Sequence, residues 1–259
     1  MIAPEDPPGF VVRTEAQKAA SDHGFRIELR VENGWLHYGS TTAHGEIWIA
    51  GVSPHGPWLL SIDHPGVVAE FATVPLSLLA GPGLATFEFG SLTTLHATLD
   101  RVYKLGVSLP DAPLARFRAQ TARLPQTTEV ERLAVQRIGQ DIFRSALMDY
   151  WSGRCPITGI TDPALLRASH IVPWTDCNDE QRLDVHNGLL LSALWDATFD
   201  TGLVSFADDG TVLASLELSA AARTALGIES VPRLPRLRDA HRANLAIHRA
   251  RHGFSEGST

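Results

Sequence analysis

The sequence predicts an α+β protein made of two parts, and two patterns indicate this class. In the first part, short runs rich in β-branched and aromatic residues alternate with Gly, Asn and Pro, as is typical of an antiparallel sheet. In the second part, a long amphipathic helix is followed by two short strands and a further helix. With 259 residues, 44% of them hydrophobic, the chain can form one large core or two modest ones.

Residues 1–108 predict a compact mixed domain with an antiparallel sheet. Residues 109–127 contain three prolines and many polar residues, so we expect a linker there. The elements expected in the first domain are a helix over Thr14–His23, four strands between Phe25 and Asp63, a strand over Leu84–Phe89 and a helix over Ser91–Leu105.

The second domain, residues 128–259, begins with the clearest helix of the chain. Thr128 and Glu131 have the spacing of a capping box, and an apolar stripe runs from Val130 to Tyr150. After this helix we expect a strand over 168–172, a polar loop over Pro173–Asp184, a strand over 188–192, a helix over Ala193–Thr201, a hairpin turning at Asp208–Gly210 and a terminal helix rich in arginine.

Composition excludes several classes of protein. No apolar run approaches the length of a membrane span, and the acidic, proline-rich N-terminus does not resemble a signal peptide. We therefore expect a cytoplasmic protein with no membrane partner. Cys155 and Cys177 are too few for a disulfide framework or a zinc cluster, so both are predicted to be free thiols.

The net charge of −7 does not by itself indicate a nucleic-acid-binding protein. The basic residues are unevenly distributed, however. Residues 111–259 carry 16 of the 22, and all 16 are arginine. Arginine suits bidentate contacts with phosphate, so the second part is the better candidate for a nucleic-acid contact.

Four polar residues occupy notable positions in the second domain. His170 lies in the first short strand, and Asn187 directly precedes the second. Asp196 and Asp200 are four residues apart on the following helix, so both carboxylates project from one face.

The segments ASHIVPW, LDVHNGLLL and LWDATFDTGLVSF resemble the HNH nuclease family, and the likeness runs from about Val135 to Leu226. The resemblance implies a ββα-metal nuclease domain with flanking helices. Within it, His170 corresponds to the histidine that activates water, and Asn187 to the asparagine that braces the loop. Asp196 and Asp200 lie at the family's metal-ligand positions, although Asp200 could equally be a structural helix residue. Ser169 departs from the family pattern, because an acidic or histidine ligand often precedes the base.

The resemblance further implies one divalent metal ion and double-stranded DNA as the substrate. An oxygen-only ligand set favours Mg²⁺ or Mn²⁺ over Zn²⁺. Arg154, Arg167 and Arg182 are candidates for contacting the DNA backbone. The expected function is a restriction-type endonuclease, with dependence on base modification left open. The alternatives are an HNH nuclease of a mobile element, of repair or of an antibacterial system, and a non-catalytic DNA-binding protein.

The first domain contains no motif that carries a mechanism. Because a small nuclease core has little surface for choosing a target, the added domain could read DNA; a dimerisation domain, giving a homodimer, is equally compatible. Four aromatic residues could line a pocket that stacks on an extruded base, although aromatic side chains at strand spacing are more often core. They are Trp35, Tyr38, Trp48 and Trp58.

Overall fold

The computed structural model describes residues 3–125 and 127–254, and it confirms the α+β class. The chain divides into two compact units between Ala112 and Pro113. Within the described residues, no helix is both long enough and apolar enough to cross a membrane.

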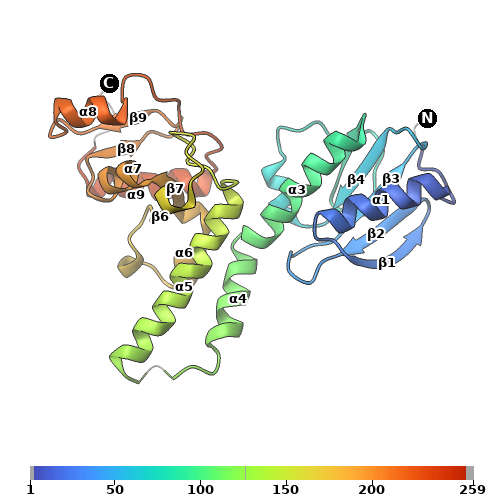
Figure 1. The fold of residues 1–259 in the computed structure, drawn as a ribbon, viewed down its shortest axis with the longest axis horizontal. Helices are drawn as coiled ribbons and strands as arrows, with labels where there is room; N and C mark the ends of the chain where they lie inside the picture. Colours follow the sequence, from blue (N-terminus) through green and yellow to red (C-terminus); the bar gives the residue numbers. More distant parts are fainter. Residues whose placement is uncertain (1–2, 126, 255–259) are drawn as a thin grey trace. The chain divides into compact units, whose positions relative to one another are not determined.

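The first unit is centred on a five-stranded antiparallel sheet in which each strand pairs with its neighbour in sequence. Two helices, α1 and α3, cover one face of this sheet (Figure 1). The elements are α1 (Phe10–Asp22), β1 (Ile27–Glu32), β2 (Trp35–Gly39), β3 (Ile47–Gly51), β4 (Trp58–Ile62), α2 (Pro65–Glu70), β5 (Ala85–Phe89) and α3 (Leu92–Ser108).

Side chains alternate between the two faces of the sheet, as strand geometry requires. Leu36 pairs with Ile49 across β2 and β3, and Ile49 pairs with Leu60 across β3 and β4. These three side chains therefore share one face, and all are fully buried under the helices. On the opposite face, Trp35 and Trp48 form a separate cluster with Ala50 and Leu59. Within the described residues, the first unit therefore has apolar side chains on both faces of its sheet, and α1 and α3 cover one of them.

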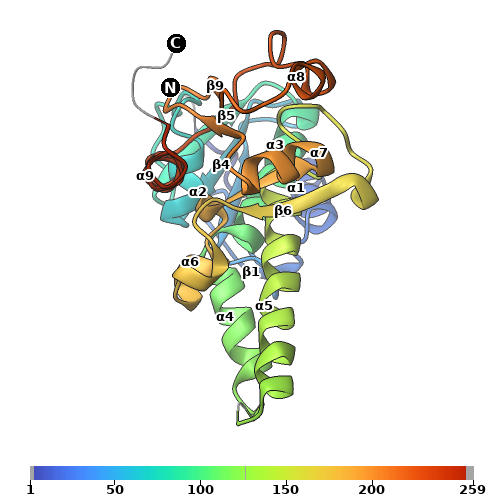
Figure 2. The ribbon, with the colours of Figure 1, turned by 90° about the vertical axis from the view of Figure 1, so that its left-hand side faces the viewer.

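The second unit combines helices with two separate two-stranded antiparallel sheets, β6–β7 and β8–β9. Figures 1 and 2 show helix α5 running past β6 and α6, in agreement with the contacts between these elements. The elements are α4 (Asp111–Thr121), which begins in the first unit, α5 (Glu129–Tyr150), β6 (Leu166–His170), α6 (Asp179–Leu183), β7 (Gly188–Ser192), α7 (Ala193–Asp200), β8 (Val204–Phe206), β9 (Val212–Ala214), α8 (Ala220–Leu226) and α9 (Asp239–Arg251), with 3₁₀ turns at Pro163–Leu165, Trp174–Asp176 and Val185–Asn187.

Helix α5 begins as expected, but it buries only the second half of the predicted stripe. The capping box between Thr128 and Glu131 is present in both directions. Val130 and Leu133, which opened the predicted stripe, are exposed. Three residues of the stripe, Ile142, Ala146 and Tyr150, are buried as predicted. The rest of the buried side is formed by Val135, Gly139, Phe143 and Leu147.

Two segments expected to lack regular structure contain helices. Helix α4 occupies much of the predicted linker, because Phe117 is buried and lies 3.4 Å from the position that a Cβ on Gly139 would occupy. Helix α6 interrupts the predicted polar loop, because Asn178 and Gln181 form a capping box that starts it. The two helices thus coincide with a local capping box in one segment and with a buried aromatic side chain in the other.

The terminal helix α9 is anchored by two buried polar side chains. His248 donates from Nε2 to the carbonyl of Phe199, accepts at Nδ1 from the hydroxyl of Ser205, and stacks on the Phe199 ring at 4.0 Å. Arg249 donates to the carbonyl of Phe206 and to the carboxylate of Asp208. These contacts fix α9 against α7 and β8, so part of its basic face is directed inward.

The anchoring of α9 predicts a pH-dependent stability. Burial lowers the pKa of His248 from 6.5 to about 4. As pH falls, the unfolded chain takes up this proton first, so the stability due to His248 is complete above pH 6.5 and is lost as pH falls towards 4. We expect a loss of roughly 3 kcal/mol from this residue, measured by urea unfolding across that range. His248→Asn should show a smaller pH dependence, whereas exposed His55→Asn should keep the wild-type slope; an unchanged slope in His248→Asn would contradict the prediction.

Candidate functional site

Strands β6 and β7 and helix α7 bring the predicted polar residues to one region of the second unit. His170 is the last residue of β6 and pairs with Gly188, the first residue of β7. All five residues of β7 are buried. Asn187 directly precedes this strand, and Asp196 and Asp200 lie on α7, which contacts β6 and β7.

The histidine is held in one tautomer. Its Nε2 lies 2.9 Å from the backbone carbonyl of Arg182, and because a carbonyl oxygen can only accept, Nε2 carries the hydrogen. In the neutral ring, Nδ1 therefore keeps its lone pair. Burial lowers the pKa of His170 below its usual 6.5, so the ring is neutral at pH 7. A neutral imidazole with a free lone pair can accept a proton.

Two aromatic rings fix the orientation of this imidazole. Phe143 on α5 stacks on it with ring centroids 3.8 Å apart and an interplanar angle of 18°. Trp174 meets it edge to face at 5.4 Å. Gly188 leaves the necessary space, because a Cβ there would lie 2.5 Å from Cζ of Phe143. The reason for this glycine is steric, since its backbone is ordinary extended chain.

Asn187 binds the loop that supplies the Arg182 carbonyl. Its side-chain oxygen accepts from the backbone N–H of Val172 at 2.8 Å. Its Nδ2 donates to the carbonyls of Gln181 and Val172, and contacts Sγ of Cys177 at 3.4 Å. Asn187 is 2% exposed, and these contacts join both ends of the segment between the two strands. It is a positioning residue that acts on His170 through the loop.

The two aspartates lie in different environments on α7. Asp196 is half-buried, whereas Asp200 is exposed. Burial raises the pKa of Asp196; the negative charge of Asp200 raises it further, and a hydrogen bond from the Ser169 hydroxyl opposes the change. The Asp200 carboxylate is therefore close enough to disfavour the charged form of Asp196.

These carboxylates fit a hard divalent cation. A cation between them would relieve their repulsion, and carboxylate oxygens are the ligands that Mg²⁺ and Mn²⁺ prefer. Among the described residues, no group of three or more His, Cys, Asp or Glu side chains could hold a metal ion. A metal here would thus have few protein ligands, and water would complete its coordination.

Comparison with known proteins finds a family match in this part of the chain. Residues 155–207 match the family model of an HNH endonuclease. The matched segment, here called the HNH segment, contains His170, Asn187, Asp196 and Asp200, and indicates a nuclease. No curated protein matches the chain. The first unit lies outside the HNH segment, so its role rests on its own structure.

The three arginines proposed as DNA contacts differ in what they do in the second unit. Arg154 is exposed next to the start of the HNH segment. Arg167 is also exposed, and it donates to the carbonyls of Ala164 and Leu166. Arg182 donates from Nε to the carbonyl of Trp174 and pairs with Asp179, so its side chain holds together the segment between β6 and β7. Phosphate contact by these residues stays a prediction.

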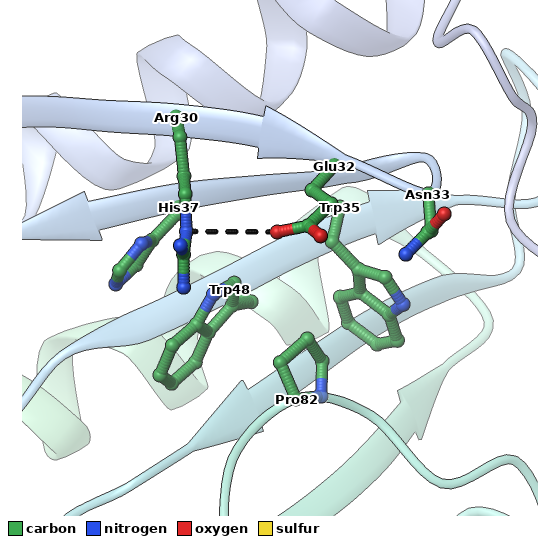
Figure 3. A pocket seen from close by; sticks show the side chains of 7 residues that line it. All are labelled: Arg30, Glu32, Asn33, Trp35, His37, Trp48 and Pro82. Carbon is green, nitrogen blue, oxygen red and sulfur yellow. Dashed lines mark ion pairs between the residues drawn. The ribbon is translucent and has the colours of Figure 1, made fainter.

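The four aromatic residues proposed as a pocket in the first unit lie on opposite faces of the sheet. Trp35 and Trp48 line a cavity of about 260 Å³ on the face without helices (Figure 3). Tyr38 and Trp58 are buried on the face under the helices, at 2% and 1% exposure. Their strand positions separate them from the cavity, because alternate residues point to opposite faces.

Several residues of the site have no signal in the sequence. Phe143 is one apolar residue among many on a long helix, and nothing in the pattern indicates that it stacks on His170. The contribution of Arg182 comes from its backbone carbonyl, which no residue type reveals. In the sequence, Ser169 is only a departure from the family pattern, and its hydrogen bond to Asp196 is not predicted.

The close contact between Gly188 and Phe143 predicts a measurable effect of one added methyl group. Gly188→Ala must displace Phe143 or Leu147, and overpacking of this kind costs about 1–3 kcal/mol. We expect the unfolding free energy to fall by that amount in denaturant titrations. The matched control is Gly90→Ala, where a Cβ would have no neighbour within 4 Å. Equal stabilities of the two variants would show that the ring has room to move.

Proposed function

We propose that the protein is a metal-dependent DNA endonuclease that hydrolyses phosphodiester bonds, and that it acts as a restriction-type enzyme. The observation that carries the proposal is the neutral, orientationally fixed imidazole of His170 within the HNH segment. A base that is to deprotonate water needs a lone pair at neutral pH, and this histidine has the tautomer and the lowered pKa that supply it.

In the proposed reaction, Nδ1 of His170 accepts a proton from a water molecule. The water oxygen forms a bond to phosphorus as the bond from phosphorus to the 3′ oxygen breaks. The departing 3′ oxygen takes a proton from solvent water, and the imidazolium of His170 returns its proton to solvent. The Arg182 carbonyl stabilises the imidazolium formed by this transfer, because it already accepts from Nε2. Phe143 and Trp174 hold the ring plane during the transfer.

Asp196 and Asp200 are the residues that would hold one Mg²⁺ or Mn²⁺. When bound, such an ion supplies stabilisation of negative charge on the phosphate and on the leaving oxygen. The Ser169 hydroxyl donates to Asp196 and keeps that carboxylate oriented. Because Asp196 is half-buried while Asp200 is exposed, Asp196 is the better fixed of the two ligands.

Double-stranded DNA is the substrate that we propose, with Arg154 and Arg167 as the exposed cations nearest in sequence to the strands of the site. The restriction-type role is supported by the organisation of the chain. A nuclease unit is joined to a second compact unit that contains its own cavity, so cleavage and choice of target can reside in different units.

The base role of His170 is tested by His170→Ala. Loss of the proton acceptor should lower the rate of plasmid nicking by at least about 100-fold, the usual contribution of general base catalysis. Binding to the same plasmid should change little, because Arg154 and Arg167, the proposed backbone contacts, remain. Exposed His55→Ala serves as the control. Cleavage by His170→Ala at the wild-type rate would exclude the proposed mechanism.

The metal requirement is tested separately with Asp196→Asn, which keeps the shape of the side chain. Removal of divalent ions by a chelator should abolish cleavage, and Mg²⁺ or Mn²⁺ should restore it. In Asp196→Asn, half-maximal activity should need about 10- to 100-fold more metal, as for other changes around a metal centre. If the wild type cleaves fully in chelator, the carboxylates have another role.

A further inference from the structure

The cavity in the first unit combines aromatic surface with polar groups. Trp35, Trp48 and Pro82 lie along one side of it, and Arg30, Glu32 and Asn33 lie along the other (Figure 3). His37 completes the lining and stacks on Trp48 with centroids 4.3 Å apart. Helices α1 and α3 contact the strands from the other face of the sheet, so within the described part of the first unit the cavity does not lie under them.

The rigidity of the aromatic side favours a planar ligand. Trp35 and Trp48 are 6% and 8% exposed, and both pack on Ala50 and Leu59 of the sheet. A ring that enters the cavity therefore meets aromatic surfaces that are already ordered, and little side-chain entropy is lost on binding.

The charges of the cavity favour a neutral ligand over a cation. Glu32 is balanced by Arg30 at 3.8 Å, and Glu46 accepts from Nε2 of His37 at 2.6 Å. The Arg30 charge offsets the Glu32 charge, so these two lining residues carry no net negative charge that would favour an ammonium group. The pair of Arg30 and Glu32 is exposed and long, so it contributes little energy and its groups can turn to a ligand.

The polar groups match a ligand with both donors and acceptors on one edge. Arg30 supplies donors, Glu32 supplies acceptors, and the Asn33 amide supplies both. Asn33 occupies a left-handed backbone position in the turn between β1 and β2, which holds its side chain at the cavity rim. The His37 ring adds a buried Nδ1 that has no hydrogen-bond partner among the described residues.

The size of the cavity limits the ligand to one ring system. Its volume of about 260 Å³ lies below the roughly 300–1,000 Å³ of typical small-molecule sites. We propose that this cavity binds a single nucleobase, stacked on Trp35 and Trp48 and recognised along its edge by Arg30, Glu32 and Asn33. The inference rests on the nuclease function proposed above, because a DNA substrate brings nucleobases, which are planar, to the protein.

A base inside a duplex cannot enter a cavity of this size, so it must be extruded or come from a free nucleoside. Extrusion costs least for a mismatched base, which gives the test. Affinities would be measured in chelator, so that no cleavage intervenes, for a 20-base-pair duplex, the same duplex with one central mismatch, and the same duplex with one 5-methylcytosine. Free adenosine, cytidine and 5-methylcytidine would be titrated separately, with tryptophan fluorescence as the signal.

We expect the wild type to bind the mismatched duplex about tenfold more tightly than the paired one, since extrusion of the mismatched base costs less. Arg30→Ala and Trp35→Leu should lose this preference. Arg30→Ala removes an exposed side chain, so it tests the cavity even if Trp35→Leu proves unstable. Arg13→Ala is the matched control, because it removes the same charge from α1.

A tryptophan fluorescence change that saturates with a free nucleoside, and that is lost in Arg30→Ala, would also support base binding in this cavity. The ligand would then be a free nucleoside and not an extruded base. Equal affinities for paired and mismatched duplexes, with no response to any nucleoside, would overturn the proposal; so would a mismatch preference that both cavity variants keep. Cleavage with Mg²⁺ or Mn²⁺ is measured on the same preparations. DNA cleavage without a base preference would refute only this inference, whereas base binding without cleavage in either metal would refute the nuclease function.

Discussion

The chemistry of the second unit depends on one hydrogen bond, from Nε2 of His170 to the backbone carbonyl of Arg182. It decides which ring nitrogen carries the hydrogen, and so which nitrogen can take a proton from water. The carbonyl belongs to a loop, and a loop holds such a position only if it is tied down. Asn187 provides this restraint through the backbone at both ends of the segment.

Burial affects the two kinds of ionisable group at the site in opposite directions. It lowers the pKa of His170 and raises that of Asp196, so both groups are moved towards their neutral forms. For the histidine the neutral form is the one that a general base requires. For the aspartate it is the form that binds metal poorly, and the Ser169 hydroxyl partly offsets the effect. The uncovered Asp200 retains its access to solvent.

The sequence predicted those features that depend on residue type and spacing. The α+β class, the capping box of α5, the two strands around His170 and the match to an HNH nuclease all follow from local patterns. It did not predict α4, whose helix is ordered by the contact of Phe117 with a distant part of the chain. The sheet of the first unit shows the same limit. Alternation along β2 already separates Trp35 from Tyr38, whereas the pairing register is needed to place Trp48 on the face of Trp35 and Trp58 on the face of Tyr38.

Gly139 illustrates how the long helix serves the site. A glycine in a helix interior sacrifices about 1 kcal/mol of helix propensity compared with alanine. Here a Cβ would lie 2.7 Å from the Trp174 ring, and Trp174 in turn contacts His170. One turn later the same helix face presents Phe143 to the other side of the imidazole. The face of helix α5 is thus fitted to Trp174 and His170. A substitution such as Gly139→Ala would raise the helix propensity of α5 but would displace the Trp174 ring.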